Sequence, residues 1–166
     1  MARIDFERIY AEHAERLFGF LVYRTGEREL AEDLVAETFE TVYLTGRRFD
    51  PRKGSERTWL YAIALNKLRD HARRQGAESR AVVRLAAQLP AGGADSGPDS
   101  ELERIEARDE LLRLLARLSD EEREAISLRY GGGLSLREIA RVTGEPVTTV
   151  EGRVYRALRK LRAALD

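Results

Sequence analysis

The chain of 166 residues contains no cysteine, which excludes disulfides, thiolate zinc sites and cysteine nucleophiles together. Its only two histidines, His13 and His71, are far apart in the sequence, so we expect neither a metal site nor a cofactor. The sequence also contains no phosphate-binding glycine loop and no recognisable pair of nucleophile and base. An enzyme is therefore not expected.

Long apolar runs are missing too, and charged residues begin at Arg3. No segment approaches the roughly 20 apolar residues of a membrane-spanning helix, so we expect a cytoplasmic protein with no membrane contact of its own. The composition, 43% hydrophobic and 35% charged, is typical of a folded helical protein. Its length allows one ordinary domain or two small ones.

The formal net charge is zero, but the charges are unevenly distributed along the chain. Residues 1–44 carry 5 basic and 10 acidic side chains, and residues 81–133 carry 7 and 11. By contrast, residues 45–80 carry 10 basic and 4 acidic side chains, and residues 134–166 carry 7 and 4. Two basic zones therefore alternate with two acidic ones, which indicates two DNA-facing surfaces and further surfaces for another partner.

Residues 134–165 have the pattern of a helix-turn-helix. Ser135 with Glu138 predicts the start of a short helix, and Gly144 followed by Pro146 predicts its end. A second helix follows, with a polar, basic outer face and with an apolar face made of Val150, Val154, Leu158, Leu161 and Leu165. An ordinary α-hairpin with solvated arginines is the alternative, but small residues around the turn allow the close helix crossing of a DNA-binding motif.

Two amphipathic helices are expected in the first 44 residues, one over residues 5–23 and one over residues 27–44. The second presents Asp33, Glu37 and Glu40 on one outer side, where like charges one turn apart cost a few tenths of a kcal/mol each. Solvation alone commonly accounts for such a face. A basic protein partner would also relieve the repulsion.

The basic zone that follows combines cations with aromatic rings. Ser55 is the expected start of a helix that continues to Arg74. We expect Phe49 to be exposed in the preceding loop, with Trp59 near the start of the helix. Cations beside exposed rings suit single-stranded nucleic acid, because stacking contributes roughly 1–3 kcal/mol per base. Burial of both rings in the core is the alternative.

Residues 76–100 are rich in glycine, proline and small residues and predict a flexible linker. The linker divides the chain into residues 1–75 and residues 101–166. The expected fold class is therefore all-α, with two small helical domains joined by the linker and the second domain ending in the helix-turn-helix.

Helix starts in the second domain are predicted by two further capping patterns. Ser100 with Glu103 predicts a helix that runs to Leu118. Ser119 with Glu122 predicts the next helix. A run of three glycines then predicts the turn into the helix-turn-helix.

Three runs of the sequence, in this order, are AEDLVAETFETVY, FDPRKGSERTWLYAIALNKLRDHARR and LARLSDEEREAISLRYGGGLSLREIARVTGEPVTTVEGRVYRALRKL. Together they resemble the extracytoplasmic-function sigma factors of bacterial RNA polymerase. These minimal sigma factors consist of the second and fourth conserved sigma regions joined by a linker. The resemblance implies a subunit that directs RNA polymerase to specific promoters and assists promoter melting.

The resemblance also implies roles for three groups of residues. The acidic helix would dock on a coiled coil of the largest subunit of the polymerase core through Asp33, Ala36, Glu37 and Glu40. The minus-ten element, as a single strand, would be bound by Phe49, Arg52, Lys53, Arg57, Trp59, Asn66, Lys67, Arg69, Arg73 and Arg74. The double-stranded minus-thirty-five element would be bound by Arg137, Thr148, Thr149, Glu151, Gly152, Arg153, Tyr155, Arg156 and Arg159. An anti-sigma factor is a further implied partner.

Three positions depart from the family's pattern. Ala36 stands where the family commonly has glutamine, and Glu151 stands where it commonly has lysine or arginine. A carboxylate in the recognition helix repels phosphate but can accept a hydrogen bond from cytosine. Gly152 costs about 1 kcal/mol of helix propensity and allows close approach to DNA.

Two other functions stay open on the sequence alone. One is a stand-alone helix-turn-helix regulator whose N-terminal helices dimerise or sense a ligand. The other is a helical adaptor that binds protein and no DNA. Reversing the charges of Asp33 and Glu37 would abolish transcription for a sigma factor but would leave operator binding by a regulator intact.

Overall fold

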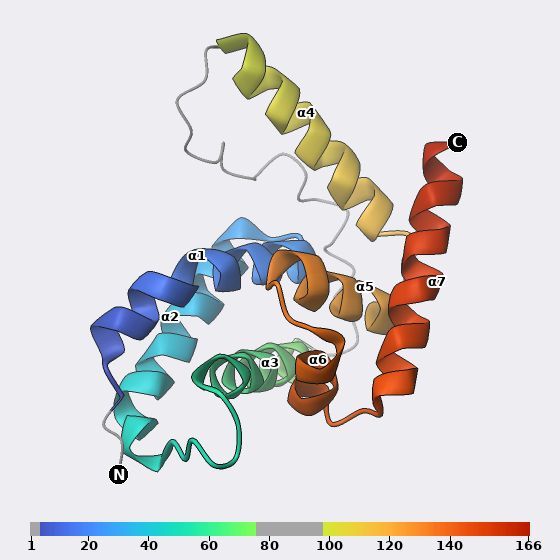
Figure 1. Ribbon diagram of the computed structural model, residues 1–166. Helices are drawn as coiled ribbons and strands as arrows, with labels where there is room; N and C mark the ends of the chain where they lie inside the picture. Colours follow the sequence, from blue (N-terminus) through green and yellow to red (C-terminus); the bar gives the residue numbers. More distant parts are fainter. Residues whose placement is uncertain (1–3, 76–97) are drawn as a thin grey trace.

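The computed structural model describes residues 4–75 and 98–166 (Figure 1). All regular structure in these residues is helical, which confirms the all-α prediction. The first half contains α1 (Phe6–Thr25), α2 (Arg28–Thr45), the 3-10 turn η1 (Gly46–Arg48) and α3 (Glu56–Arg74). The second half contains α4 (Pro98–Leu115), α5 (Asp120–Ile126), the π-helical turn η4 (Ser127–Gly131), α6 (Leu136–Thr143) and α7 (Val147–Leu165). Most of the predicted linker, residues 76–97, lies outside the described residues.

Local hydrogen bonds fix several helix starts where the sequence predicts them. Ser55 Oγ accepts a backbone N–H from the first turn of α3 at 3.1 Å. Ser135 Oγ accepts the N–H of Glu138 at 3.1 Å, while Glu138 Oε1 accepts the N–H of Ser135 at 3.0 Å. The same reciprocal pair of bonds joins Ser119 and Glu122 at the start of α5. Each cap satisfies backbone donors that the helix itself cannot, which contributes about 1 kcal/mol.

The start of α4 differs from the prediction. The helix begins at Pro98 and ends at Leu115, so Ser100 lies inside it and does not cap it. Proline suits the first helical turn because its missing N–H would have no partner there. After Leu115 the backbone tightens, and the Leu118 N–H donates to the Leu115 carbonyl at 3.1 Å. The predicted linker, which ran to residue 100, therefore overlaps the helix.

The two halves pack against each other around a common core. Helix α1 contacts α5 and η4, and α3 contacts α6, as Figure 1 shows. Glycines at the junction allow the close approach. A methyl group added at Gly131 would lie 3.1 Å from Phe20 Cα, and one added at Gly132 would lie 2.9 Å from the Tyr61 ring. This packing was not predicted, because it joins residues that are far apart in the sequence.

Leu134 lies in this shared core and is fully buried. Replacing it with alanine (Leu134→Ala) should lower the free energy of unfolding by about 2–5 kcal/mol, because the lost methyl groups leave a cavity. Leu165 is 65% exposed, so Leu165→Ala is a matched control that should change stability by less than about 0.5 kcal/mol. Urea denaturation of the two variants measures both values, and equal effects would contradict the shared core.

Tyr61 is also fully buried, and within the described residues its hydroxyl has no hydrogen-bond partner. Replacing it with phenylalanine (Tyr61→Phe) should therefore leave stability unchanged or raise it by up to about 1 kcal/mol, because an unpaired polar group is removed. Burial raises the pKa of the phenol to about 12. Above about pH 10 this phenol ionises only in the unfolded chain, which costs the wild type stability that the variant keeps. Denaturation at about pH 8 and about pH 11 should show the variant's advantage growing with pH.

Candidate functional site

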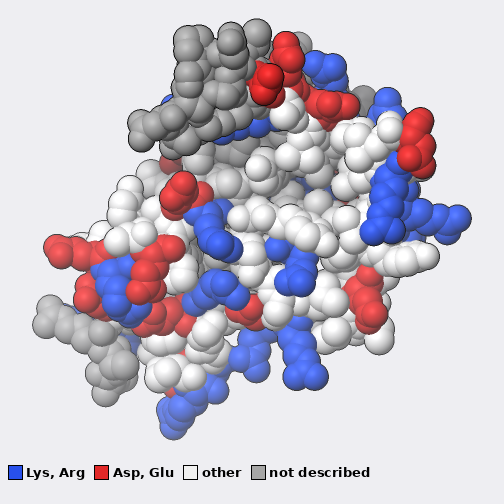
Figure 2. Space-filling model, turned by 45° about the horizontal axis from the view of Figure 1, so that its top comes forward, with Lys and Arg blue, Asp and Glu red and all other residues white. Residues whose placement is uncertain are grey.

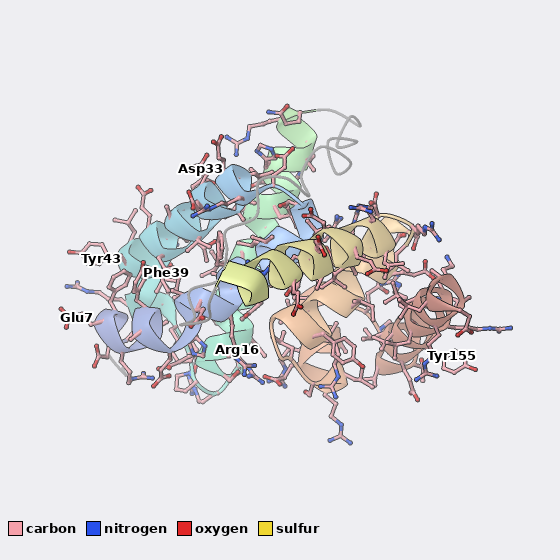
Figure 3. The ribbon with its side chains drawn as sticks, turned by 90° about the horizontal axis from the view of Figure 1, so that it is seen from above. Glu7, Arg16, Asp33, Phe39, Tyr43 and Tyr155 are labelled. Carbon is pink, nitrogen blue, oxygen red and sulfur yellow. The ribbon has the colours of Figure 1, made fainter. Side chains whose placement is uncertain are left out.

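Helix α2 carries the acidic outer face that the sequence predicts. Asp33, Ala36 and Glu40 are exposed, and Glu37 is half-buried. None of the three carboxylates forms an ion pair with a residue that the structure describes. Asp33 and the 72% exposed Tyr43 lie near opposite ends of the helix (Figure 3). An unpaired acidic row of this kind is electrostatically complementary to a basic partner.

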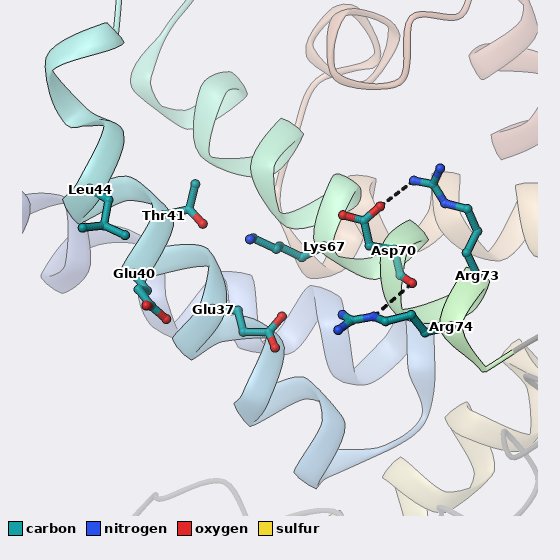
Figure 4. Close-up of a pocket in the computed structure, with 8 residues that line it drawn as sticks. All are labelled: Glu37, Glu40, Thr41, Leu44, Lys67, Asp70, Arg73 and Arg74. Carbon is teal, nitrogen blue, oxygen red and sulfur yellow. Dashed lines mark hydrogen bonds and ion pairs between the residues drawn. The ribbon is translucent and has the colours of Figure 1, made fainter.

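A groove of about 720 Å³ lies between α2 and the basic side of α3 (Figure 4). It is lined by Glu37, Glu40, Thr41, Leu44, Lys67, Asp70, Arg73 and Arg74. Lys67 and Arg74 point across the groove toward α2, whereas Arg73 turns to Asp70 and forms an ion pair with it. The residues expected to bind the polymerase and those expected to bind DNA therefore face each other, which the sequence did not reveal.

The aromatic pair beside this surface differs from the expectation. Phe49 is buried, with only 8% of its surface exposed, so the predicted exposed loop ring is wrong. Its ring lies against the half-buried Trp59 with the centroids 5.4 Å apart. Burial of a phenyl ring is worth about 2 kcal/mol, which favours packing over exposure even in a charged loop. Arg52 and Lys53 in the same loop are exposed as predicted.

Arg57, expected to contact the minus-ten strand, forms an ion pair with Glu138 of the other half of the molecule in this structure. Its Nε donates to Glu138 Oε2 at 3.0 Å, and its terminal nitrogen donates to Glu138 Oε1. The hydrogen bond from Arg57 lowers the pKa of the Glu138 carboxyl, against the opposing effect of burial. This ion pair was not predicted, because 81 positions separate its two residues along the chain.

The outer face of α3 presents the polar and basic side chains that the sequence predicts. Asn66, Arg69, Arg73 and Arg74 are exposed, and Lys67 is half-buried. The Arg69 guanidinium lies 3.8 Å from Glu124 of α5, so it is turned toward the second half. A row of exposed cations along one helix suits the phosphates of a single strand.

Helices α6 and α7 form the predicted helix-turn-helix. Gly144 ends α6 in the left-handed region, with φ of 75°, and its N–H donates to the Ala140 carbonyl at 2.9 Å. The core side of the motif buries Ile139, Val150, Val154 and Ala157. Leu165 was expected on this apolar side but is exposed, because the last turns of α7 project beyond α5 (Figure 1).

The outward side of α7 presents the residues expected to bind double-stranded DNA. Exposed there are Thr148, Glu151, Tyr155, Arg156 and Arg159, with Arg137 exposed on α6, whereas Thr149, Gly152 and Arg153 are half-buried. Tyr155 points away from the molecule (Figure 3). Arg153 lies 3.5 Å from Glu145, which orients it beside the turn. An exposed helix face of this kind can enter the major groove.

The charges are unevenly spread on the surface as well as along the sequence. In Figure 2, acidic side chains gather around a basic patch at the edge formed by α1 and α2, basic side chains extend over the middle, and both kinds lie along the right edge. Across residues 4–75 and 98–166, no group of three or more potential ligands could hold a metal ion, and no helix could cross a membrane.

Each half of the chain matches the model of a known protein family. The model of Sigma-70 region 2 matches residues 9–78, and that of Sigma-70, region 4 matches residues 108–161. The chain is 30% identical over 161 residues to the ECF RNA polymerase sigma factor RpoE of Cereibacter sphaeroides, covering 95% of this chain and 84% of that protein. The chain belongs to the extracytoplasmic-function family of RNA polymerase sigma factors. As a sigma factor, it directs RNA polymerase to promoters in transcription initiation.

Further similar proteins include the sigma factor BldN of Streptomyces coelicolor, 32% identical over 96% of this sigma factor, which spans only 60% of BldN. Among solved structures, CnrH in complex with the cytosolic domain of CnrY has a TM-score of 0.67 and 29% identity over 97% of this chain and 87% of that one. RpoE of Bartonella quintana, in complex with the anti-sigma factor NepR, has a TM-score of 0.73 and covers 97% of this chain and 96% of that one. Because the two chains are only 24% identical, this similarity supports a common fold and nothing further.

Two of the three departures from the family pattern, Ala36 and Glu151, are exposed, and the third, Gly152, is half-buried. Ala36 is exposed within the acidic face and presents a methyl group there. Glu151 is exposed on the outer side of α7. A methyl group added at Gly152 would lie 3.1 Å from the guanidinium of Arg156, a flexible group that can move aside.

Proposed function

We propose that this sigma factor divides its work among three surfaces. The acidic face of α2 binds the polymerase core, α3 and the loop before it bind the minus-ten strand, and α6 with α7 bind the minus-thirty-five element. The observation that carries the proposal is the opposite charge of two neighbouring helices in the region 2 half. Helix α2 presents unpaired carboxylates and α3 presents exposed cations, so one helix suits a basic protein and the other suits DNA.

The carboxylates of Asp33, Glu37 and Glu40 would pair with basic side chains on the coiled coil of the largest polymerase subunit. They form no ion pair with a described residue, although Lys67 and Arg74 point toward α2 across the groove, and pairing with the coiled coil would relieve their mutual repulsion further. The exposed Tyr43 and Leu44 at the end of the same helix would add apolar contact area.

For the minus-ten element, Lys67, Arg73 and Arg74 would hold the backbone of the displaced strand. Extruding a base from the duplex costs a few kcal/mol of stacking, so melting requires contacts that form only with the open strand. Arg52 and Lys53 at the exposed loop supply further cations, and Asn66 supplies an amide that can bond a base edge. Because Phe49 is buried against Trp59, it would hold the Trp59 ring in position and would not stack on a base itself.

For the minus-thirty-five element, the exposed side of α7 would lie in the major groove. Arg156 and Arg159 would contact phosphate or guanine, and Glu151 would accept from cytosine N4. This role requires binding and no catalysis by the chain, and it places the protein in the cytoplasm with bacterial RNA polymerase. An anti-sigma factor is a further proposed partner, supported by the similar fold of a sigma factor held by NepR.

Transcription with purified components tests this proposal. Purified protein is added to sigma-free core polymerase and a library of promoter fragments, and the 5′ ends of the transcripts are sequenced. We expect discrete starts that share two upstream elements at a fixed spacing. Absence of any complex with the core would overturn the proposal and favour a stand-alone regulator.

A further inference from the structure

The beginning of α1 contacts both ends of the segment that joins α2 to α3. At the α2 end, a methyl group added at Gly46 would lie 3.6 Å from Ile4 Cβ, so the residue pair packs the chain before α1 against the start of η1. At the α3 end, Arg8 in the first turn of α1 meets Glu56, the first residue of α3. Between these two contacts lies the loop of residues 49–55, which is expected to receive the minus-ten strand. The beginning of α1 is therefore placed where it can set the position of this loop.

The contact between Arg8 and Glu56 is an ion pair that uses both carboxylate oxygens. One terminal nitrogen of the guanidinium donates to Glu56 Oε1 at 2.8 Å and to Oε2 at 2.9 Å. The other terminal nitrogen donates to Glu12, one turn further along α1, at 3.2 Å. Both members of the pair remain partly exposed, so it adds little to overall stability. Charge-assisted hydrogen bonds to both oxygens nevertheless fix the orientation of the two groups as well as their distance.

Both partners of the pair lie on capped helix ends. Asp5 Oδ1 accepts the backbone N–H of Arg8 at 3.2 Å, which fixes Arg8 in the first turn of α1. Ser55 lies directly before Glu56 and caps α3 by accepting the N–H of Thr58 at 3.1 Å. The pair therefore joins two rigid helix ends, which gives the start of α3 a set position relative to α1.

The loop itself is closed by local hydrogen bonds around Asp50. Its carbonyl accepts the N–H of Lys53 at 3.0 Å. Its carboxylate accepts the backbone N–H of Arg52 at 3.0 Å and the guanidinium of the same residue at 3.1 Å. A loop with these internal bonds changes the direction in which it points mainly when its ends move. The ion pair to α1 holds the end next to α3.

We propose that Arg8 is a positioning residue for the minus-ten strand. Its pair with Glu56 fixes the start of α3 against α1 and thereby sets how the preceding loop meets the bases. The proposal rests on the proposed function, because the position of the loop matters only if the loop binds that strand. Glu56 does not serve the strand through its charge, since a carboxylate repels phosphate. Its contribution is to hold the loop where one base sequence is preferred over another.

The test uses holoenzyme assembled from the full chain and core polymerase. A pool of single-stranded oligonucleotides with randomised positions is offered to the wild-type holoenzyme, and the enriched strand is identified by sequencing. Selectivity is the ratio of the affinity for this strand to the affinity for its scrambled version. Arg8→Met and Glu56→Ala each remove the pair. The matched control is Glu12→Ala, which has the same change of charge and size as Glu56→Ala but removes only the contact that Arg8 makes within α1.

We expect Arg8→Met and Glu56→Ala each to lower selectivity about threefold to tenfold, because small displacements of a binding group weaken the contacts that depend on its position. Glu12→Ala should keep the wild-type selectivity. The two substitutions together should lose no more than either alone, since both remove the same interaction. Affinity for a double-stranded fragment carrying the upstream element found by transcription should not change in any variant, whereas a general loss of folding would lower it.

Removal of charge alone predicts a different result. Glu56→Ala would then bind both the enriched strand and its scrambled version more tightly, with unchanged selectivity, and this outcome would overturn the proposal. Additive losses in the double variant would overturn it as well, because the two residues would then act separately. Failure of the proposed function would be seen separately, as a wild-type holoenzyme that enriches no strand.

Discussion

Replacing Asp33 and Glu37 with lysine (Asp33→Lys and Glu37→Lys together) is expected to weaken binding to core polymerase by about 100-fold and to abolish transcription. Asp33 is exposed, Glu37 is half-buried at the groove, and neither forms an ion pair with a described residue. It turns two attractions to a basic partner into two repulsions, worth roughly 3 kcal/mol together. Fluorescence anisotropy of the labelled sigma factor, titrated with core polymerase, measures the loss.

The matched control for this prediction is on α4. Glu106 and Glu110 are exposed and have the same four-residue spacing, so reversing both gives the same change of net charge elsewhere on the surface. This control should bind the core with little change. Equal losses in the two double variants would mean that net charge matters and that α2 is not the docking face. Unchanged binding of core polymerase by the α2 variant would also exclude α2 as the docking face.

Neutralising Arg73 and Arg74 (Arg73→Gln and Arg74→Gln together) is expected to lower promoter opening by about 30-fold while leaving core binding intact. Both guanidinium groups are exposed on α3, and each would neutralise a phosphate of the displaced strand. The loss of Arg73 also leaves the Asp70 carboxylate without its ion-pair partner, which adds a repulsive charge next to the strand. Permanganate reactivity of thymines in the minus-ten element measures opening directly.

Salt dependence separates this effect from a general loss of basic charge. For a single strand, each phosphate contact contributes about 0.7 to the slope of log affinity against log salt. The α3 variant should therefore show a slope smaller by about 1.4 for holoenzyme on a pre-melted promoter. Arg113→Gln with Arg117→Gln, two exposed arginines of the second half, should leave the slope unchanged. A similar change of slope in both variants would contradict the assigned role of α3.

The local features of the fold were predictable because their causes are local. Capping serines, with Ser135 as an example, act through hydrogen bonds to residues three positions away, and Gly144 ends α6 through its own backbone conformation. Two helix-start signals that lie close together in the sequence can predict different first residues for the same helix. The proline at position 98 starts α4 ahead of the capping pattern at Ser100, which predicted residue 101 as the first helical residue, so the predicted start was three residues late.

The features that were missed depend on contacts between distant parts of the chain. Phe49 was predicted to be an exposed loop residue, but its ring packs against Trp59 in the structure. The site residues on α2 and α3 were found from charge and resemblance, but the groove that brings them face to face depends on how the helices pack. The ion pair between Arg57 and Glu138 exists only because α3 meets α6. Local sequence patterns do not indicate such contacts between distant residues.

DNA footprinting on one promoter, with and without core polymerase, tests the central claim most directly. With the core, the sigma factor should protect two elements about 25 base pairs apart and make thymines of the downstream element reactive to permanganate. The free protein should show little protection at the same concentration, because its two basic surfaces are modest and its halves are packed together. Strong protection of a single continuous site by the free protein, with no change on adding the core, would contradict the account and identify a stand-alone regulator.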